Sequence, residues 1–245
     1  MKRIYTLLLT FIMCIALLAG CTGKDSSLSI SEKSFDTPAK AIEYFVAAIA
    51  ENNASKALEA CNINEYGENF DYAAYTERTG AILPVSVTGA PSGYSMYAEI
   101  NRYTQASYLG TQIKGFAYSF FTDKGIIDAT PLEGTDQIDA FIESVDPAKL
   151  KNLTVVRIDT PYPDTMNKEE TKALFKEYAA MYGADEQTEV IVLYELDGKH
   201  YGGGFTLLRY GKDWKISRLN SVVANQASSG AVTATTEEEY RYLTE

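Results

Sequence analysis

The chain has 245 residues, 46% of them hydrophobic, which is enough for one large domain or for two small ones with their own cores. It carries 33 acidic and 22 basic residues, and its net charge is −11. Because so acidic a chain repels the phosphate backbone, we expect no nucleic-acid partner. One histidine and three cysteines do not supply a zinc site of the usual composition, and we expect no cofactor.

The N-terminal residues have the pattern of a secretory signal. Lys2 and Arg3 form a short basic region, and residues 4–19 form an apolar run slightly shorter than the ~20 residues of a bilayer span. The sequence "LAGC" that follows resembles the lipobox of bacterial lipoproteins. In that family a peptidase cuts before the cysteine, here between Gly20 and Cys21, and the cysteine sulfur carries a diacylglycerol. The resemblance implies that residues 1–20 are a signal peptide.

An acylated Cys21 would anchor the chain to the lipid bilayer, on the extracytoplasmic face of a bacterial cell membrane. Without residues 1–20 the net charge is −13, so the lipid rather than the protein surface must bind the membrane. Cys14 would leave with the signal, and Cys61 would then have no disulfide partner. The polar, serine-rich residues up to 34 predict a flexible tether over 21–34.

The folded part is predicted to begin at residue 35 with two helices. Asp36 or Thr37 can cap the first helix, and Pro38 suits its first position. Asn53 can start a second, short helix, on which Cys61 shares the apolar face and is expected to pack rather than react. Helical spacing places four apolar residues on one face of the first helix: Ile42, Phe45, Val46 and Ile49.

Residues 62–150 are predicted to form a helical insertion, whose first part, 62–94, has the least regular pattern. A long helix is expected across 95–121, because five residues follow helical spacing there: Met96, Ile100, Tyr103, Ser107 and Gly110. Thr135 can cap a further helix that carries Ile138, Phe141, Ile142 and Val145. Asp146 precedes a proline and should end it.

The last third of the α+β domain, which we expect to end at residue 223, has the clearest pattern. Residues 153–159 predict a strand, and the helix that follows has Asn167 and Glu170 in the spacing of a capping box and Gly183 at its C-terminal end.

Residues 188–196 form a strand that is apolar on both faces and therefore covered on both sides. Asp197 and Gly198 are a strong hairpin signal, and strands at 199–210 and 214–219 complete a three-stranded antiparallel meander. Residues 224–245 are small, polar and acidic, and we interpret them as a disordered tail.

Two segments resemble domains of the nuclear transport factor 2-like superfamily. The sequence "TPAKAIEYFVAAIAENNASKALEAC" (37–61) is similar to their opening helices. The sequence "LYELDGKHYGGGFTLLRYGKDWKISRLNS" (193–221) is similar to their closing hairpins, with Trp214 after a turn. The resemblance implies an α+β fold in which a curved antiparallel sheet packs on N-terminal helices as a cone. Glycines at 202–204 would permit the curvature. The insertion at 62–150 departs from the family pattern.

No catalytic constellation stands out. His200 lies beside a predicted turn, where exposure is expected, and "YGGGF" lacks the lysine of a phosphate loop. If the cone held an enzyme of isomerase or hydrolase type, Tyr194 with Glu195, or Tyr201 with His200, would be the first suspects for acid and base.

Tyrosine is the most unusual feature of the composition, with 18 residues. Amphipathic rings line ligand pockets and protein interfaces, and they also fill half-buried core positions. The candidate ligand or partner surface consists of Tyr97, Tyr103, Tyr108, Tyr194 and Tyr201. Together these observations predict a membrane-anchored, extracytoplasmic lipoprotein that acts as a non-enzymatic binding module for an envelope protein or a small ligand. One alternative is the enzyme just described, and another is a transporter solute-binding lipoprotein with two α/β lobes.

Overall fold

The computed structural model describes residues 30–31, 33–80, 83–122, 130–224, 226 and 228–245. The predicted signal peptide, the cleavage site at Gly20 and Cys21, and most of the predicted tether lie outside the described residues. Within the described part of the chain, no helix combines the length and the apolar character that a membrane crossing needs.

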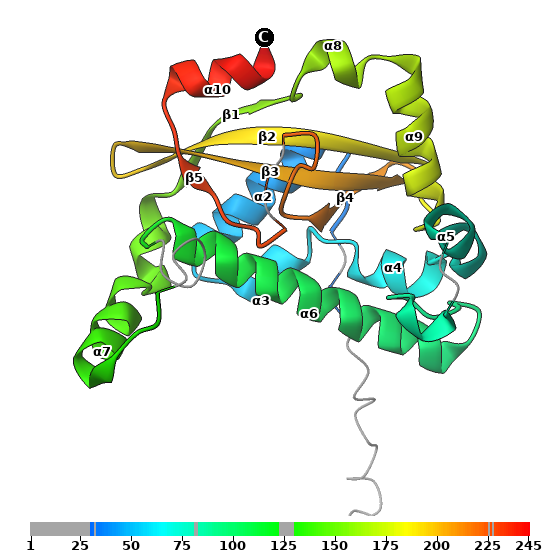
Figure 1. Ribbon diagram of the computed structural model, residues 1–245, viewed down its shortest axis with the longest axis horizontal. Coiled ribbons are helices and arrows are strands. Elements are labelled where there is room, and N and C mark those ends of the chain that lie inside the picture. Colours follow the sequence, from blue (N-terminus) through cyan, green and yellow to red (C-terminus); the bar gives the residue numbers. More distant parts are fainter. Residues whose placement is uncertain (1–29, 32, 81–82, 123–129, 225, 227) are drawn as a thin grey trace, which may run out of the picture.

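The architecture is α+β, as predicted, with one antiparallel sheet between helices (Figure 1). The strand order is β1-β2-β3-β4, and β5 pairs with β3 beside β4. The α-helices are α2 (Pro38–Ala50), α3 (Ala54–Leu58), α4 (Ile63–Asn69), α5 (Tyr72–Thr79), α6 (Ser95–Ser119), α7 (Gly134–Ser144), α8 (Pro163–Met166), α9 (Glu169–Ala180) and α10 (Glu237–Thr244), with short 3-10 turns η1 (Pro84–Ser86) and η2 (Pro147–Asn152). The strands are β1 (Thr154–Asp159), β2 (Glu186–Leu196), β3 (Lys199–Tyr210), β4 (Asp213–Arg218) and β5 (Thr233–Ala234).

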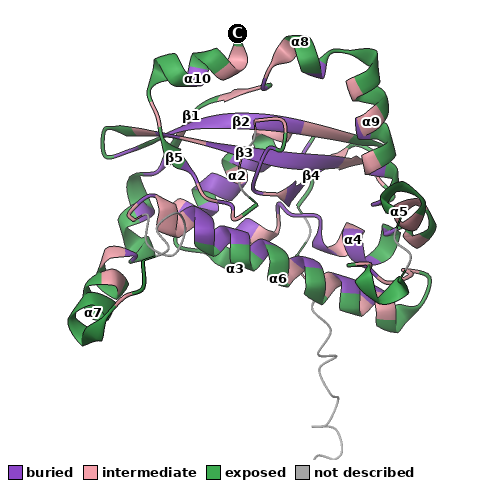
Figure 2. Ribbon diagram, in the orientation of Figure 1, coloured by how far each residue is buried: buried purple, intermediate pink, exposed green. Residues whose placement is uncertain are grey.

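The main hydrophobic core lies between the sheet and helices α2 and α6, while α10 covers the opposite face of β2. Figure 2 shows the buried colour concentrated in α2 and the central strands. Thr37 caps α2 and Pro38 opens it, and Asn53 caps α3 by accepting the Lys56 N–H at 2.9 Å, all as predicted. Cys61 is buried, as predicted, and burial raises the pKa of its thiol.

Residues 30, 31, 33 and 34, which belong to the predicted tether, are among the described residues, and some of them contact the folded domain. The Ile30 carbonyl accepts from the Asn64 amide at 3.1 Å, the Lys33 carbonyl accepts from Lys215 Nζ at 2.6 Å, and the Phe35 carbonyl accepts from Trp214 N–H at 2.8 Å. Phe35 therefore satisfies a backbone donor on the outer edge of β4, and the residues before it bind side chains of β4 and α4. The expectation of a free tether up to residue 34 was wrong at its C-terminal end for this reason.

The β2–β3–β4 meander matches the prediction closely. Asp197 and Gly198 both have positive φ, 49° and 78°, which is the geometry of a tight hairpin turn. The middle of β2, from Val190 to Tyr194, is buried on both faces. A Cβ on Gly204 would lie 2.9 Å from the Ser221 nitrogen, so this glycine allows the chain after β4 to approach β3.

Helix α6 confirms the long helix predicted across 95–121, but it buries a different face. Met96, Ile100 and Tyr103 are exposed, whereas Asn101 and Gln105 are buried, together with Gln112 further along the same face. The amide side chains face inward because they bind backbone groups. Asn101, for example, accepts the Ala90 N–H and donates to the Ala90 carbonyl, both at 2.8 Å.

Two predicted helix starts are corrected, and one predicted helix end is confirmed. Asn167 does not cap α9 but follows α8, where its N–H bonds the Pro163 carbonyl, so the capping box with Glu170 does not form. Helix α7 begins one residue before Thr135. Gly183 adopts the left-handed conformation after α9, as predicted for a glycine at a helix end.

The predicted disordered tail is also corrected. β5 pairs with β3, and α10 carries a capping box in which Thr236 and Glu239 bond each other's backbone N–H groups. Tyr240 is only 2% exposed, and its hydroxyl donates to the Ile191 carbonyl at 3.0 Å. One buried ring and a capping box hold this acidic segment on the sheet.

Candidate functional site

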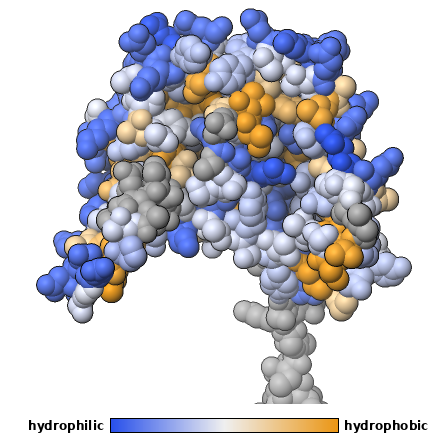
Figure 3. Space-filling view, viewed as in Figure 1, coloured by the Kyte–Doolittle hydropathy of each residue, from blue (hydrophilic) through white to orange (hydrophobic). Residues whose placement is uncertain are grey.

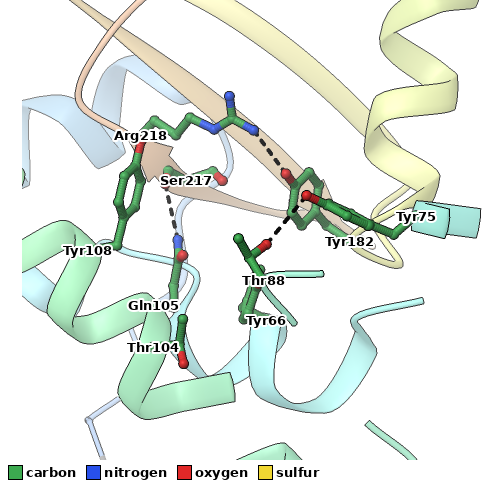
Figure 4. A pocket seen from close by; sticks show the side chains of 9 residues that line it. All are labelled: Tyr66, Tyr75, Thr88, Thr104, Gln105, Tyr108, Tyr182, Ser217 and Arg218. Atoms are coloured by element: carbon green, nitrogen blue, oxygen red, sulfur yellow. Dashed lines mark hydrogen bonds between the residues drawn. The ribbon is translucent and has the colours of Figure 1, made fainter. Parts of the chain in front are cut away.

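A hollow lined by tyrosines lies where α6 passes the end of β4. We call it the tyrosine pocket, and its volume is about 260 Å³. Helices α4, α5 and α6, the turn after α9, and β4 all contribute side chains, as Figure 4 shows. The lining consists of Tyr66, Tyr75, Thr88, Thr104, Gln105, Tyr108, Tyr182, Ser217 and Arg218.

Arg218, the last residue of β4, is the charged group of this pocket. Its Nη2 donates one hydrogen bond, 2.9 Å long, to the Tyr182 hydroxyl. Among the described residues no carboxylate forms an ion pair with it. Since a guanidinium has five N–H donors in a planar fork, the described residues use only a small part of its capacity. In Figure 4 the other terminal nitrogen points away from the drawn side chains.

Burial keeps the phenols of Tyr66 and Tyr108 neutral at physiological pH. Burial raises the pKa of Tyr66 to about 12, and burial also raises the pKa of Tyr108. Threonine, serine and glutamine make up the rest of the polar lining and do not ionise. Arg218 is therefore the one ionised side chain among the residues that line the tyrosine pocket.

The walls of the pocket are fixed by buried amides. Gln105 on α6 donates to the Ser217 carbonyl on β4 at 3.1 Å and to the Asn62 side chain at 2.8 Å. Both amide residues are buried, so these hydrogen bonds form in a low-dielectric environment, where they are strong and fix the position of α6 against β4. These two bonds connect α6 to β4 and to the residue before α4 at one wall of the pocket.

A second hollow also touches Arg218, on the side of helix α9. We call it the α9 pocket, and its volume is about 340 Å³. Its lining combines apolar side chains with two opposite charges, Glu189 and Arg218. The full lining is Leu174, Phe175, Tyr178, Met181, Gln187, Glu189, Arg218, Val222 and Val223. Ligand pockets usually span roughly 300–1,000 Å³, so this one lies inside the range and the tyrosine pocket just below it.

Glu189 and Arg218 belong to one row across the sheet. Thr206 of β3 is the direct partner of Glu189 on β2 and of Arg218 on β4. Directly opposed residues in antiparallel strands share a face, so Glu189 and Thr206 project to the same side. The register of β3 and β4 shifts between Thr206 and Leu207, so Arg218 follows a bulge, and its position near Glu189 is given by the α9 pocket that both line. Because neighbouring strands lie about 4.8 Å apart, the backbones of the two charged residues are roughly 10 Å apart.

The five tyrosines predicted as one surface do not lie together. Tyr108 lines the tyrosine pocket, but Tyr97 and Tyr103 lie on other parts of α6, half-buried and exposed respectively. Tyr194 and Tyr201 belong to the hydrophobic core. The alternation of β2 and β3 sends these two rings inward, which the composition alone did not reveal.

Each suspected acid–base pair, Tyr194 with Glu195 and Tyr201 with His200, consists of consecutive strand residues, whose side chains point to opposite faces of the sheet. Glu195 and His200 are opposed across the hairpin, but Glu195 is exposed. Tyr194 is fully buried, its hydroxyl has no hydrogen-bond partner, and burial raises its pKa strongly. In the residues that the structure describes, no three His, Cys, Asp or Glu side chains are grouped as metal ligands.

Sequence reasoning missed Glu189, Arg218 and Tyr182. The sequence pattern could have drawn attention to two of them, because Glu189 directly precedes the apolar run of β2 and Arg218 directly follows the buried residues of β4. Charged residues are rarely buried without a partner, so each marks a position to inspect.

Comparison with known proteins informs the fold. A cystatin-like protein from Ruminococcus gnavus has a similar solved structure, with a TM-score of 0.53 and 20% sequence identity. The match covers 87% of this chain but 44% of that one, so this chain spans less than half the length of the protein it matches. At this identity the likeness shows the α+β fold alone. No family model matches the chain, and no curated protein matches it.

Proposed function

We propose that the protein is a lipoprotein anchored through acylated Cys21 to the extracytoplasmic face of a bacterial membrane, and that its domain is a binding module rather than an enzyme. The basic start, the apolar run and the four residues ending at Cys21 support the anchor. Replacing Cys21 by alanine should move the protein from the membrane fraction or leave an unprocessed precursor. Unchanged anchoring and unchanged chain length in this variant would contradict the proposal.

The ligand we propose for the module is a small organic acid held by Arg218. The observation that carries this is a half-buried guanidinium with one protein hydrogen bond and no ion pair among the described residues. An unpaired charge in a partly buried site is costly, and a ligand carboxylate would supply the missing partner in a two-pronged bond. The surrounding rings add apolar contact area.

Titration calorimetry with two matched probes tests this proposal. 3-Phenylpropionate and 2-phenylethanol share an apolar body, but only the first carries a carboxylate. The acid should bind and the alcohol should not, and Arg218→Gln should abolish binding of the acid. Arg241→Gln, an exposed arginine on α10, is the matched control. Equal binding of the acid to wild type and Arg218→Gln would contradict an arginine site.

We further propose that the fold is a nuclear transport factor 2-like cone. Helices α2 and α3 precede the sheet and the meander closes the domain, in the order the resemblance implies. The insertion accounts for the additional helices α4 to α7. An experimental structure that superposes better on cystatin-like sheets than on such cones would overturn this assignment.

A further inference from the structure

The α9 pocket has a carboxylate, which the tyrosine pocket lacks, and its wall consists largely of aliphatic and methionine side chains. Five apolar side chains line it, Leu174, Phe175, Met181, Val222 and Val223. Figure 3 shows apolar atoms at several places on this face of the molecule, including α7 and the beginning of α6. Tyr94 and Met96, at the start of α6, also border a hollow, but its lining carries no charged side chain, whereas the lining of the α9 pocket includes two opposite charges.

Glu189 is a buried carboxylate of which only one oxygen accepts hydrogen bonds from the described residues. It is 2% exposed, and its Oε2 accepts from the Ser221 hydroxyl at 2.7 Å and from the Val223 N–H at 2.8 Å. Its Oε1 accepts no hydrogen bond from the described residues and is not among the fully enclosed atoms that lack a partner. This oxygen therefore opens into the pocket that Glu189 lines.

The charge on Glu189 has no ion-pair partner among the described residues either. Arg218 lies in the same pocket and forms no ion pair with it, although Glu189 is close enough to interact electrostatically with the guanidinium. Buried charges are costly unless they are paired. A molecule with an ammonium group beside a carboxylate would complete both pairs at once, and the row geometry of roughly 10 Å between backbones leaves space for it.

We propose that the α9 pocket binds an α-amino-acid-like zwitterion with an apolar side chain: Glu189 takes the ammonium, Arg218 takes the carboxylate, and the wall of α9 covers the side chain. This inference rests on the proposed function, because it uses the same guanidinium, and it adds the ligand class and the pocket. A purely structural role for Glu189 would be to hold residues 221–223 through the two hydrogen bonds of Oε2. That role does not use Oε1 and does not account for Arg218 in the same pocket.

Four probes with one phenyl body separate these possibilities in calorimetry on the full chain in detergent: L-phenylalanine, 3-phenylpropionate, 2-phenylethylamine and 2-phenylethanol. L-Phenylalanine should bind most tightly, by roughly tenfold or more over the probes with a single charge, as charge-assisted hydrogen bonds imply. Glu189→Gln keeps an oxygen that can accept from Ser221 and Val223 but loses the charge. It should weaken L-phenylalanine binding by about tenfold and leave 3-phenylpropionate unchanged.

The control for that variant is Glu195→Gln, which removes an exposed carboxylate from the same strand. Urea unfolding midpoints verify that each variant is folded. If 3-phenylpropionate binds as tightly as L-phenylalanine and Glu189→Gln changes nothing, the zwitterion inference is overturned while the arginine site stands. If no probe shows binding that depends on Arg218, both are overturned.

Discussion

Replacing Gln112 by methionine should destabilise the domain strongly, although the two side chains are similar in size. Gln112 is 1% exposed, and its Oε1 accepts the Leu219 N–H at 2.9 Å. Its Nε2 donates to the Ser228 carbonyl at 2.8 Å and to the Tyr108 hydroxyl at 3.0 Å. Methionine cannot form these hydrogen bonds, so at least the Leu219 N–H and the Ser228 carbonyl lose their partner.

Each buried polar group left unsatisfied costs about 1–3 kcal/mol, so two of them give a loss of about 2–6 kcal/mol in the free energy of unfolding. In a domain of this size 1 kcal/mol lowers Tm by about 2–4 °C. Thermal unfolding followed by the fluorescence of Trp214, the single tryptophan, measures the change. Lys114→Met, on the exposed side of α6, places the same residue where nothing is lost. Equal Tm values for the two variants would refute the reasoning.

Two further predictions concern α6 and α10. Gly110→Ala should raise Tm, because a Cβ there meets nothing within 4 Å and alanine favours helix. Gly115→Ala should lower Tm, because its Cβ would lie 2.0 Å from the Ser229 carbonyl oxygen. If both variants raise Tm, the close contact between α6 and Ser229 is absent. Hydrogen bonds from Thr236 lower the pKa of Glu239 below its ordinary 4.5. The ionised carboxylate therefore stabilises α10 fully above pH 4.5, and this stabilisation is lost as the pH falls through the lowered pKa. Carbon chemical shifts of residues 237–244 should therefore be helical at neutral pH and move toward coil in strong acid; shifts that do not depend on pH would contradict this.

Elements defined by local signals were predictable from the sequence. The Thr37–Pro38 start, the Asn53 cap and the Asp197–Gly198 turn each follow from chemistry within a few residues, and the structure confirms them. The capping box at Thr236 was equally local but was passed over, because acidic composition suggested disorder.

Periodicity marks only part of the buried face of α6: Leu109, Ile113 and Phe116 follow helical spacing and are buried, but the buried amides do not belong to an apolar pattern. Helical spacing of apolar residues selects Met96 and Ile100, yet these are exposed while Gln105 and Gln112 are buried. Amides are buried when backbone groups of distant segments need partners, here the Ser217 carbonyl and the Leu219 N–H. That need arises from the tertiary fold and leaves no mark in the local pattern.

The candidate site was unpredictable for the same reason. Glu189 and Arg218 are 29 positions apart in the sequence, and only the register of β2, β3 and β4 aligns both with Thr206. The tyrosine count directed attention to rings, whereas the two charges carry the chemistry we propose.

Methyl NMR during titration with L-phenylalanine tests the account's central claim most directly. The methyl groups of Met181, Val222 and Val223 line the α9 pocket, while those of Ile138 and Ile142 are exposed on α7. We predict saturable shifts at the first three, none at the two isoleucines, and loss of the response in Arg218→Gln. Shifts confined to α7, or a response that persists in Arg218→Gln, would contradict the account.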